Sequence, residues 1–565
     1  MTNQTANNYE KYVPIQPIAI TDRKWPTKTL TKAPLWCSVD LRDGNQALVI
    51  PMNLQEKLDM FKLLVDIGFK EIEIGFPSAS DTEYKILRTL IEQNHIPDDV
   101  TVQVLVQARK HLIEKTFESV KGAKNAIIHF YNSTSTLQRK VVFKKDMQGI
   151  IDIAVEGAKL IRTLADQAIK DGTNIRFEYS PESFTGTEID FAIEICAKVM
   201  AEIGATPDNK IILNLPATVE MSSPNIYADQ IEYFCKNLPN RHCAIISIHP
   251  HNDRGTAVAA AELAMLAGAE RVEGTLFGNG ERTGNVDLLT IALNMFTQAI
   301  DPKLNLHDMN RIKGIYEHCT KMVVHERHPY AGELVFTAFS GSHQDAISKG
   351  FDYMKDSKST LWEVPYLPID PSDLGREYEP IIRINSQSGK GGAAFVLQTY
   401  FGYQLPKGMH PEFGNFVKTV SDQKGDELSK EEIFDIFEQQ YVYANAPYAL
   451  KKHKIFEETA DSDENIVHFE GVVSVDGVDQ NVHGTGNGPI DAFFHAISGI
   501  GVKDYSFVSY DEHALSSGSD SKAIAYIKLQ TPQGGNVFGV GVSANINIAS
   551  IRGILSAINR SLKNE

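Results

Sequence analysis

The sequence predicts a (β/α)8 TIM barrel, then a mostly helical connector, then a smaller α+β domain. Eight short apolar runs alternate with helix-like segments, the rhythm changes after residue 300, and a two-part pattern recurs near the end. At 565 residues the chain is longer than one hydrophobic core accommodates. We place the domains at residues 1–325 (extension and barrel), 326–452 (connector) and 453–565 (C-terminal domain).

Each of the eight runs is short, rich in β-branched residues and followed by polar side chains. The runs are 35–39, 71–76, 101–106, 126–131, 175–180, 210–216, 244–250 and 272–278. Between them lie segments with helical periodicity, such as NLQEKLDMFKLLVDIG. Eight strands alternating with helices over roughly 250 residues are typical of a TIM barrel. An open doubly wound sheet is the alternative, but no GxGxxG follows the first run, which argues against a dinucleotide fold.

The C-terminal part of the chain differs from the barrel in composition and pattern. A Pro-rich stretch at 363–373 and a Gly/Ser-rich stretch at 385–394 indicate a connector. Residues 471–498 and 523–559 each read as two strands, a turn and an apolar helix, which predicts two β-β-α repeats. Neither repeat carries a cluster of acids, bases or nucleophiles, so a binding role suits this domain better than chemistry.

The overall composition narrows the class of protein. A formal net charge of −17 disfavours nucleic acid as a partner, because phosphate binding requires a basic surface. No apolar run approaches the roughly 20 residues that span a bilayer, and the N-terminus lacks the apolar core of a secretory signal. Five scattered cysteines predict a reducing compartment. We therefore expect a cytoplasmic protein with no membrane partner.

Residues with metal-ligand chemistry follow three of the predicted strands. Asp43 follows the first in DLRDGNQ, His249 and His251 end the seventh in HPHNDRG, and Asn285 follows the eighth in GNGERTGN. Strand ends meet on one face of a barrel, and a spacing of two on an extended segment points both imidazoles to the same side. A structural role is the alternative for the two histidines by themselves. Together the four side chains predict a site for Zn²⁺, Mn²⁺ or Mg²⁺.

Further polar side chains lie at other strand ends and are expected on the same face. His129 closes the fourth run, Ser180 and Glu182 follow the fifth, and Thr218 follows the sixth. Each by itself fits an ordinary loop residue, but barrel packing does not require four polar groups at strand ends. Their shared position favours a substrate pocket.

LRDGNQ, HPHND-G and GNGERTGN together resemble the 2-isopropylmalate synthase and homocitrate synthase family, and the match covers nearly the whole chain. The DGNQ form and the C-terminal module are similar to the longer branch of 2-isopropylmalate synthases. The resemblance implies an acyltransferase that condenses acetyl-CoA with 2-ketoisovalerate, hydrolyses the thioester to give 2-isopropylmalate and CoA, and thereby starts leucine biosynthesis. It also implies a divalent metal, K⁺ as a candidate activator and feedback inhibition by leucine.

The resemblance assigns roles to individual residues. The metal ligands are Asp43, His249, His251 and Asn285; substrate-binding groups are His129, Ser180 and Thr218; catalytic groups are Arg42, Glu182, His343 and Tyr378. Arg42 stabilises negative charge on the keto oxygen, and His343 with Tyr378 acts in proton abstraction from the acetyl methyl, with Glu182 as the runner-up that positions the base. In the family, His343 and Tyr378 fold over the barrel of the partner, which implies a homodimer.

Three loop regions are expected to bind anionic groups. The run 388–392 (SGKGG) is a candidate contact for the phosphates of CoA, with a plain linker as the alternative. Small residues precede a helix around Gly486 and Ala544, where exposed N–H groups can receive the carboxylate of leucine.

Three alternative functions stay open at this point. The first is homocitrate or citramalate synthesis on the same scaffold, and the second is a carbon–carbon lyase of the same superfamily. The third is a non-catalytic leucine sensor, which cannot release CoA from acetyl-CoA.

Overall fold

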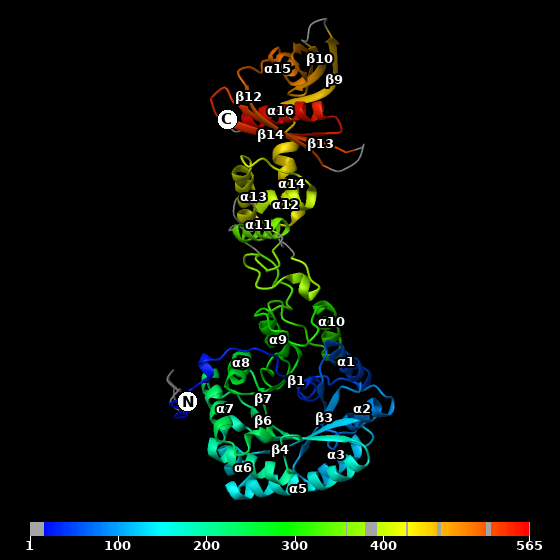
Figure 1. Ribbon diagram of the computed structural model, residues 1–565. Helices are drawn as coiled ribbons and strands as arrows, with labels where there is room; N and C mark the ends of the chain where they lie inside the picture. Colours follow the sequence, from blue (N-terminus) through cyan, green and yellow to red (C-terminus); the bar gives the residue numbers. More distant parts are fainter. Residues whose placement is uncertain are drawn as a thin grey trace, which may run out of the picture. The chain divides into compact units, whose positions relative to one another are not determined.

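The computed structural model describes residues 16–338, 340–357, 359–378, 392–424, 428–459, 465–515 and 521–563. The chain divides into two compact units (Figure 1). Unit 1 comprises Met1–Phe336 and Pro368–Tyr378, and unit 2 comprises Thr337–Leu367 and Glu379–Glu565. The domain boundaries predicted from the sequence stay a prediction.

Unit 1 is a closed barrel of eight parallel strands in the order β1 to β8. The strands are β1 Leu35–Ser38, β2 Glu71–Gly75, β3 Thr101–Gln107, β4 Asn125–Ser133, β5 Asn174–Glu182, β6 Ile211–Ala217, β7 Ala244–Pro250 and β8 Arg271–Gly274. Every predicted run forms a strand, which confirms the barrel and excludes the open sheet. The last strand is shorter than predicted, because Leu276–Gly278 turns into a 3-10 helix with Phe277 at a φ of 57°.

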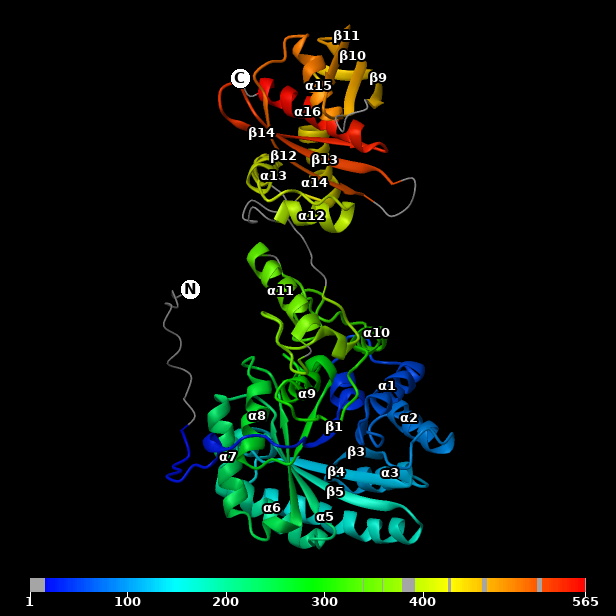
Figure 2. The same ribbon diagram turned by 45° about the horizontal axis from the view of Figure 1, so that its top comes forward.

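Helices surround the barrel strands (Figures 1 and 2). They are α1 Leu54–Ile67, α2 Asp81–Glu92, α3 Lys110–Val120, α4 Thr136–Gln138, α5 Met147–Lys170, α6 Ile189–Ile203, α7 Pro224–Asn237, α8 Ala257–Ala267, α9 Leu288–Phe296 and α10 Met309–Thr320. The first shows why they begin and end where they do. Asn53 and Glu56 form a capping box at its start, and Gly68, with φ 111°, ends it.

A segment before the barrel lies against α7. The Arg23 and Trp25 side chains both donate to the Asp229 carboxylate, and the backbone N–H groups of Lys24 and Trp25 donate to Glu232. Both carboxylates are almost fully buried. These contacts hold the extension to the outside of the barrel.

Unit 2 combines helices with two three-stranded antiparallel sheets, ordered β11-β10-β9 and β12-β13-β14. Its helices are α11 Gly341–Ser357, α12 Gly392–Phe401, α13 His410–Lys424, α14 Lys430–Phe437, α15 Pro489–Ser498 and α16 Ile546–Lys563. Its strands are β9 Tyr448–Thr459, β10 Asn465–Val475, β11 Val478–Gly486, β12 Ser506–Ala514, β13 Ala523–Gln530 and β14 Asn536–Ser543. Both predicted repeats are present, and each has one strand more than predicted.

The additional strands, β9 and β12, lie at sheet edges, each paired with one neighbour. Their sequences, YALKKHKIFEET and SFVSYDEHA, contain no apolar run, and their described residues are exposed or half-buried. Strand β13 lies at the centre of its sheet and is buried on both faces. Ala525 and Ile527 pack with α15 and α16, whereas Ile524 and Tyr526 pack with the connector helices.

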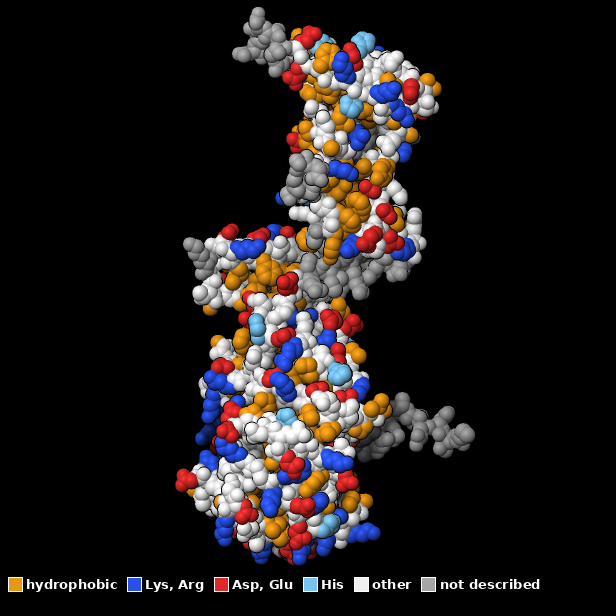
Figure 3. All heavy atoms as spheres, turned by 90° about the vertical axis from the view of Figure 1, so that its right-hand side faces the viewer, with side chains coloured by type: hydrophobic (Ala, Val, Ile, Leu, Met, Phe, Trp, Pro, Cys, Tyr) orange, Lys and Arg blue, Asp and Glu red, His pale blue; other side chains and the backbone are white. Residues whose placement is uncertain are grey.

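The surface does not alter the expectations drawn from composition. On the face shown in Figure 3, acidic and basic side chains are interspersed. No helix among the described residues is long and apolar enough to cross a membrane. The exclusion of nucleic acid as a partner stays a prediction.

Candidate active site

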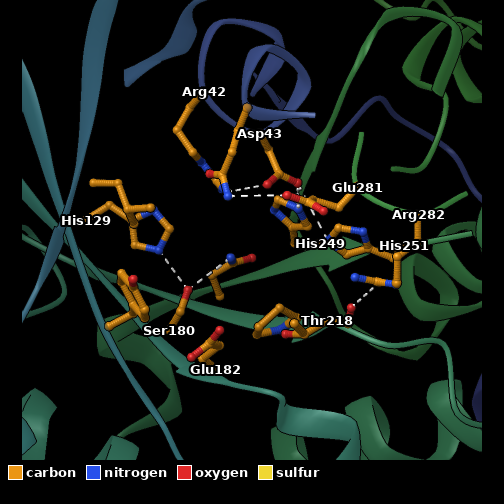
Figure 4. Close-up of a pocket in the computed structure, with 15 residues that line it drawn as sticks. Arg42, Asp43, His129, Ser180, Glu182, Thr218, His249, His251, Glu281 and Arg282 are labelled. Atoms are coloured by element: carbon orange, nitrogen blue, oxygen red, sulfur yellow. Dashed lines mark hydrogen bonds and ion pairs between the residues drawn. The ribbon is translucent and has the colours of Figure 1, made fainter. Parts of the chain in front are cut away.

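A cavity of about 250 Å³ opens where the barrel strands end (Figure 4). It contains most of the polar residues that the sequence predicts for this face. Its lining comprises Arg42, Asp43, Gln46, Leu105, His129, Tyr131, Ser180, Glu182, Asn214, Pro216, Thr218, His249, His251, Glu281 and Arg282. The predicted strand-end residues therefore converge on one pocket.

The four predicted metal ligands lie together beside this cavity. Asp43 Oδ2 is 3.4 Å from His249 Nε2 and 3.6 Å from His251 Nε2. The Asn285 Oδ1 atom is 2.8 Å from His249 Nε2. One ligand atom from each of Asp43, His249 and His251 lies within 4.8 Å of the others, and all three residues are buried.

The donor set fits a divalent cation. Asp43 Oδ2 is buried and has no hydrogen-bond partner among the described residues, although two imidazole nitrogens face it. Burial would raise the pKa of the Asp43 carboxyl, but Arg42 and the two histidines outweigh burial and hold it below its ordinary value. An ionised oxygen facing two imidazoles and an amide oxygen is a mixed N/O site of the kind that Zn²⁺, Mn²⁺ or Mg²⁺ accepts.

Different elements bring these ligands together. Asp43 lies in a π-helical turn, Asp40–Gly44, directly after β1. His249 lies near the end of β7, and His251 forms an isolated bridge with Asn285, which closes the loop after β8 onto β7. The site therefore depends on the barrel's closure, since Asp43 is separated from the other three residues by more than 200 residues of chain.

A buried carboxylate beneath the cavity orients the first histidine. Glu273 Oε2, on β8, is 2.8 Å from His249 Nδ1 and accepts a hydrogen bond from Asn214 Nδ2 at 3.0 Å. A proton held on Nδ1 leaves Nε2 with its lone pair toward Asp43 and Asn285. Carboxylate partners of this kind fix the tautomer and raise the basicity of a ligating imidazole.

Arg42 lies next to the cluster and is held by two carboxylates. Its Nη1 donates to Asp43 Oδ1 at 2.7 Å, and its Nε donates to Glu73 on β2. Burial opposes ionisation of the Glu73 carboxyl, but Arg42 and His129 lower its pKa to about 2. A fixed guanidinium therefore faces the cavity beside the metal cluster.

The local structure of His129 differs from expectation. It does not close its strand, because β4 continues to Ser133, so His129 lies within the strand with its side chain buried. Its Nδ1 is 2.7 Å from Glu73 Oε2 and its Nε2 is 2.7 Å from Ser180 Oγ. It lines the cavity and also joins two other polar groups.

The sequence predicts that Ser180 and Glu182 follow the fifth strand, but both lie within it, because β5 continues to Glu182. Glu182 is the last residue of β5, and its carboxylate accepts from the Ser133 hydroxyl. Thr218 directly follows β6, and its Oγ1 accepts from the Ser183 N–H at 3.0 Å. These contacts orient both side chains at the wall of the cavity.

His343 and Tyr378 are not among the described residues that line this cavity. His343 is exposed on α11 of unit 2, where its ring stacks on Tyr366 with centroids 4.1 Å apart. Tyr378 is the last described residue of its segment in unit 1 and is half-buried, and burial raises the pKa of its hydroxyl. Their assignment to catalysis stays a prediction.

The structure describes two of the predicted anion-binding loops, those around Gly486 and Ala544, and only the last residue of the third. Residues 388–391 of the SGKGG run lie outside the described residues. Gly486 ends β11, where an added Cβ would lie 2.5 Å from the N–H nitrogen of Ala492 on α15. Ala544 is exposed between β14 and α16. Both effector residues therefore lie near the start of a helix, as predicted.

Sequence reasoning missed a layer of charged and amide side chains inside the barrel. Arg271 is fully buried and pairs with Glu71, Glu178 and Glu273. Others in the layer are Glu73, Gln103, Asn214 and Ser247. The available signal was the charge at alternate positions of two buried strands, EIEIG and RVEG, since alternate strand residues point into a barrel.

The chain is similar to known proteins along nearly its whole length. Residues 33–315 match the HMGL-like family, 333–398 an alpha-isopropylmalate synthase post-catalytic domain-like family, and 427–562 the LeuA allosteric (dimerisation) domain. A protein of Clostridium acetobutylicum named 2-isopropylmalate synthase is 58% identical over 98% of this chain and 99% of its own. This chain belongs to the 2-isopropylmalate synthase family.

Relatives with the same name are similar over equally long stretches. One from Rhodospirillum rubrum is 53% identical over 97% of this chain and 98% of its own. Another from Rhizobium johnstonii is 55% identical over 98% of both chains. The HMGL-like family is divalent-metal dependent, in agreement with the Asp43, His249 and His251 cluster, and the C-terminal domain indicates a leucine-regulated homodimer.

Proposed function

We propose that this member of the family condenses acetyl-CoA with 2-ketoisovalerate and hydrolyses the thioester, giving 2-isopropylmalate and CoA. The observation that carries the proposal is the convergence of Asp43, His249, His251 and Asn285 beside a fixed Arg42, in a chain related over its full length to 2-isopropylmalate synthases. Acetyl-CoA and 2-ketoisovalerate are thus its substrates, leucine its inhibitor, and a cytoplasmic homodimer its working form.

Asp43, His249, His251 and Asn285 would hold a divalent cation, which would supply Lewis-acid chemistry at the carbonyl of the keto acid. Side chains of the protein stabilise the developing charge and bind the substrate. Arg42, held between Asp43 and Glu73, presents positive charge where the keto oxygen becomes negative. Thr218 binds the substrate carboxylate at the cavity wall, with Ser180 and His129 as further polar contacts.

The acetyl methyl must lose a proton before it attacks the carbonyl. A base for this step needs close placement and a pKa near the working pH. We assign it to His343 with Tyr378, both from the partner subunit, and give Glu182 the role of positioning the base. The exposure of the His343 side chain in this chain leaves it accessible to a second copy.

The branched side chain of the keto acid requires an apolar surface. Leu105, Tyr131 and Pro216 supply apolar atoms to the cavity lining. We assign the isopropyl group to this part of the wall. A longer, carboxylated side chain, as in 2-ketoglutarate, would bury an unpaired charge there, which disfavours homocitrate synthesis.

The test is the release of CoA thiol from acetyl-CoA in metal-replete protein with 2-ketoisovalerate, pyruvate or 2-ketoglutarate, each with and without EDTA. Metal-dependent release that is greatest with 2-ketoisovalerate supports the proposal. Greater release with pyruvate or 2-ketoglutarate would transfer the chain to citramalate or homocitrate synthesis. No release with any keto acid would overturn the proposal and favour the sensor.

Leucine regulation has a separate test. Leucine titration should lower the rate of CoA release and raise the melting temperature of the regulatory unit, because a ligand stabilises the state that it binds. Gly486→Ala should weaken both effects, since the added methyl collides with α15. A titration that changes neither quantity in the parent protein would contradict leucine feedback.

A further inference from the structure

Lys57 is a fully buried lysine in unit 1 to which the proposed reaction gives no role. It lies on α1, and its Nζ donates to Glu83 Oε1 on α2 at 2.5 Å. The same Nζ donates to the backbone carbonyl oxygen of Leu41 at 3.3 Å. Buried lysines are rare, and a buried ion pair by itself adds little stability, so this placement calls for another explanation.

Leu41 belongs to the π-helical turn Asp40–Gly44, the turn that carries Arg42 and Asp43. Contacts from the loop after β8 fix both ends of this turn. The Asp40 carboxylate accepts from the Leu276 N–H at 3.0 Å, and Asn279 Nδ2 donates to the Gly44 carbonyl at 3.0 Å. Lys57 adds a contact at the middle, one residue before Arg42.

Glu83 is seated against β2. A Cβ added at Gly75 would lie 1.6 Å from Glu83 Oε2, so the absence of a side chain at Gly75 leaves room for the carboxylate. Gly75 lies two residues after Glu73, which holds Arg42. Glu83 Oε2 is buried and has no hydrogen-bond partner among the described residues, so Lys57 is the charged group that compensates it.

Together these contacts place one ion pair between β2, α1, α2 and the turn. Lys57 and Glu83 also border a second cavity, of about 490 Å³, whose lining shares Arg42 and Gln46 with the active-site cavity. The pair therefore lies directly behind the residues that face the substrate.

We propose that Lys57, held by Glu83, is a positioning residue that sets the Asp40–Gly44 turn so that Asp43 reaches the metal and Arg42 reaches the keto oxygen. The part concerning Arg42 rests on the proposed function, whereas the part concerning Asp43 rests on metal binding alone. Neither Lys57 nor Glu83 touches substrate; both act through the turn.

The experiment compares four variants of the full-length protein: Lys57→Met, Glu83→Gln, the double variant of both, and Lys313→Met. Lys313 is a matched control, because it is mostly buried on α10 and paired with Glu333, away from the turn. The affinity of each metal-free protein for Mn²⁺ is measured by titration calorimetry. Melting temperature, kcat and KM for 2-ketoisovalerate are measured beside it.

Lys57→Met is expected to weaken Mn²⁺ binding about tenfold and to lower kcat by a similar factor with little change in KM, as loss of a contact behind a metal ligand does. The double variant should recover melting temperature, because no buried charge is left unpaired, but its Mn²⁺ affinity should stay low. Lys313→Met should keep parental affinity.

A purely structural pair behaves differently: the double variant would then recover Mn²⁺ affinity and kcat together with melting temperature, which overturns the inference. Parental Mn²⁺ affinity in Lys57→Met, or no Mn²⁺ binding by the parent, overturns it as well. If the parent binds Mn²⁺ but releases no CoA, the proposed function fails, and the Asp43 part of the inference is still decided by the Mn²⁺ affinities.

Discussion

Glu273→Gln is the change that tests most directly how the barrel interior prepares the metal site. The carboxylate is fully buried and receives four hydrogen-bond contacts. His249 Nδ1 and Asn214 Nδ2 lie 2.8 and 3.0 Å from Oε2, and Arg271 Nη1 and Gln103 Nε2 donate to Oε1 at 2.8 and 2.9 Å. A glutamine has one acceptor oxygen, so its amide group must face one of these two pairs of donors.

Either orientation harms the site. If the amide faces His249, the imidazole must accept on Nδ1, which moves its proton to Nε2, the nitrogen that faces Asp43. If it faces Arg271, a buried guanidinium loses a charged partner, and unsatisfied buried donors cost about 1–3 kcal/mol each. Loss of such a partner typically weakens metal binding 10- to 100-fold, or about 1.4–2.8 kcal/mol.

The assay is titration calorimetry of Mn²⁺ into metal-free protein, together with CoA release at saturating Mn²⁺. Glu71→Gln is the matched control, because Glu71 belongs to the same buried layer and pairs with Arg271 and Arg176 but does not contact a ligand. We expect both variants to lose stability and only Glu273→Gln to lose Mn²⁺ affinity. Mn²⁺ affinity within twofold of the parent in Glu273→Gln, or an equal loss of Mn²⁺ affinity in both variants, would show that Glu273 does not prepare the metal site through His249.

Three further outcomes are expected. Burial raises the pKa of Asp40 to about 7 from 3.8, so the stabilising contribution of Asp40 is full below about pH 4 and is lost as pH rises through 7. Asp40→Asn should therefore remove about 4 kcal/mol of pH dependence from the free energy of unfolding of unit 1. A difference in melting temperature between variant and parent that is independent of pH would contradict this. Arg560→Met removes the cation above the Tyr441 ring and its ion pair with Glu412. It should lower the free energy of unfolding of unit 2, measured by calorimetry, by about 2–3 kcal/mol and leave unit 1 unchanged. An unchanged unfolding transition of unit 2 would count against this prediction. Leu105→Ala enlarges the part of the cavity that we assign to the isopropyl group. The ratio of kcat/KM for a bulkier 2-keto acid to kcat/KM for 2-ketoisovalerate should rise about tenfold. An unaltered ratio would reject the assignment of the isopropyl group to this wall.

The barrel and the convergence of the candidate site residues could be predicted from the sequence. Strand periodicity is a local property, and every predicted run became a barrel strand. The ligands could be found because parallel strands in a closed barrel all end on one face, so residues that follow different strands must meet there. Asp43, His249, His251 and Asn285 could be proposed as ligands from their positions at or just after strand ends, and their role as ligands stays a prediction.

Other features depended on contacts between segments distant in sequence. The edge strands β9 and β12 lack an apolar run, so their pairing became visible only beside β10 and β13. The extent of β4 past His129 depends on hydrogen bonds to β3 and β5. Local sequence carries no record of these partners.

The burial of charged side chains inside the barrel is the feature that depends most clearly on the tertiary structure. When its strand is considered alone, a charged residue such as Arg271 or Glu273 is predicted to be solvent-exposed, because isolated charges are costly to bury. Inside the closed barrel, buried carboxylates pair with Arg271 and accept hydrogen bonds from amide side chains of neighbouring strands. Arg271 and Glu273 are therefore fully buried, and Glu273 orients His249. Their role is a property of the closed barrel, in which charges from separate strands are brought within hydrogen-bond distance.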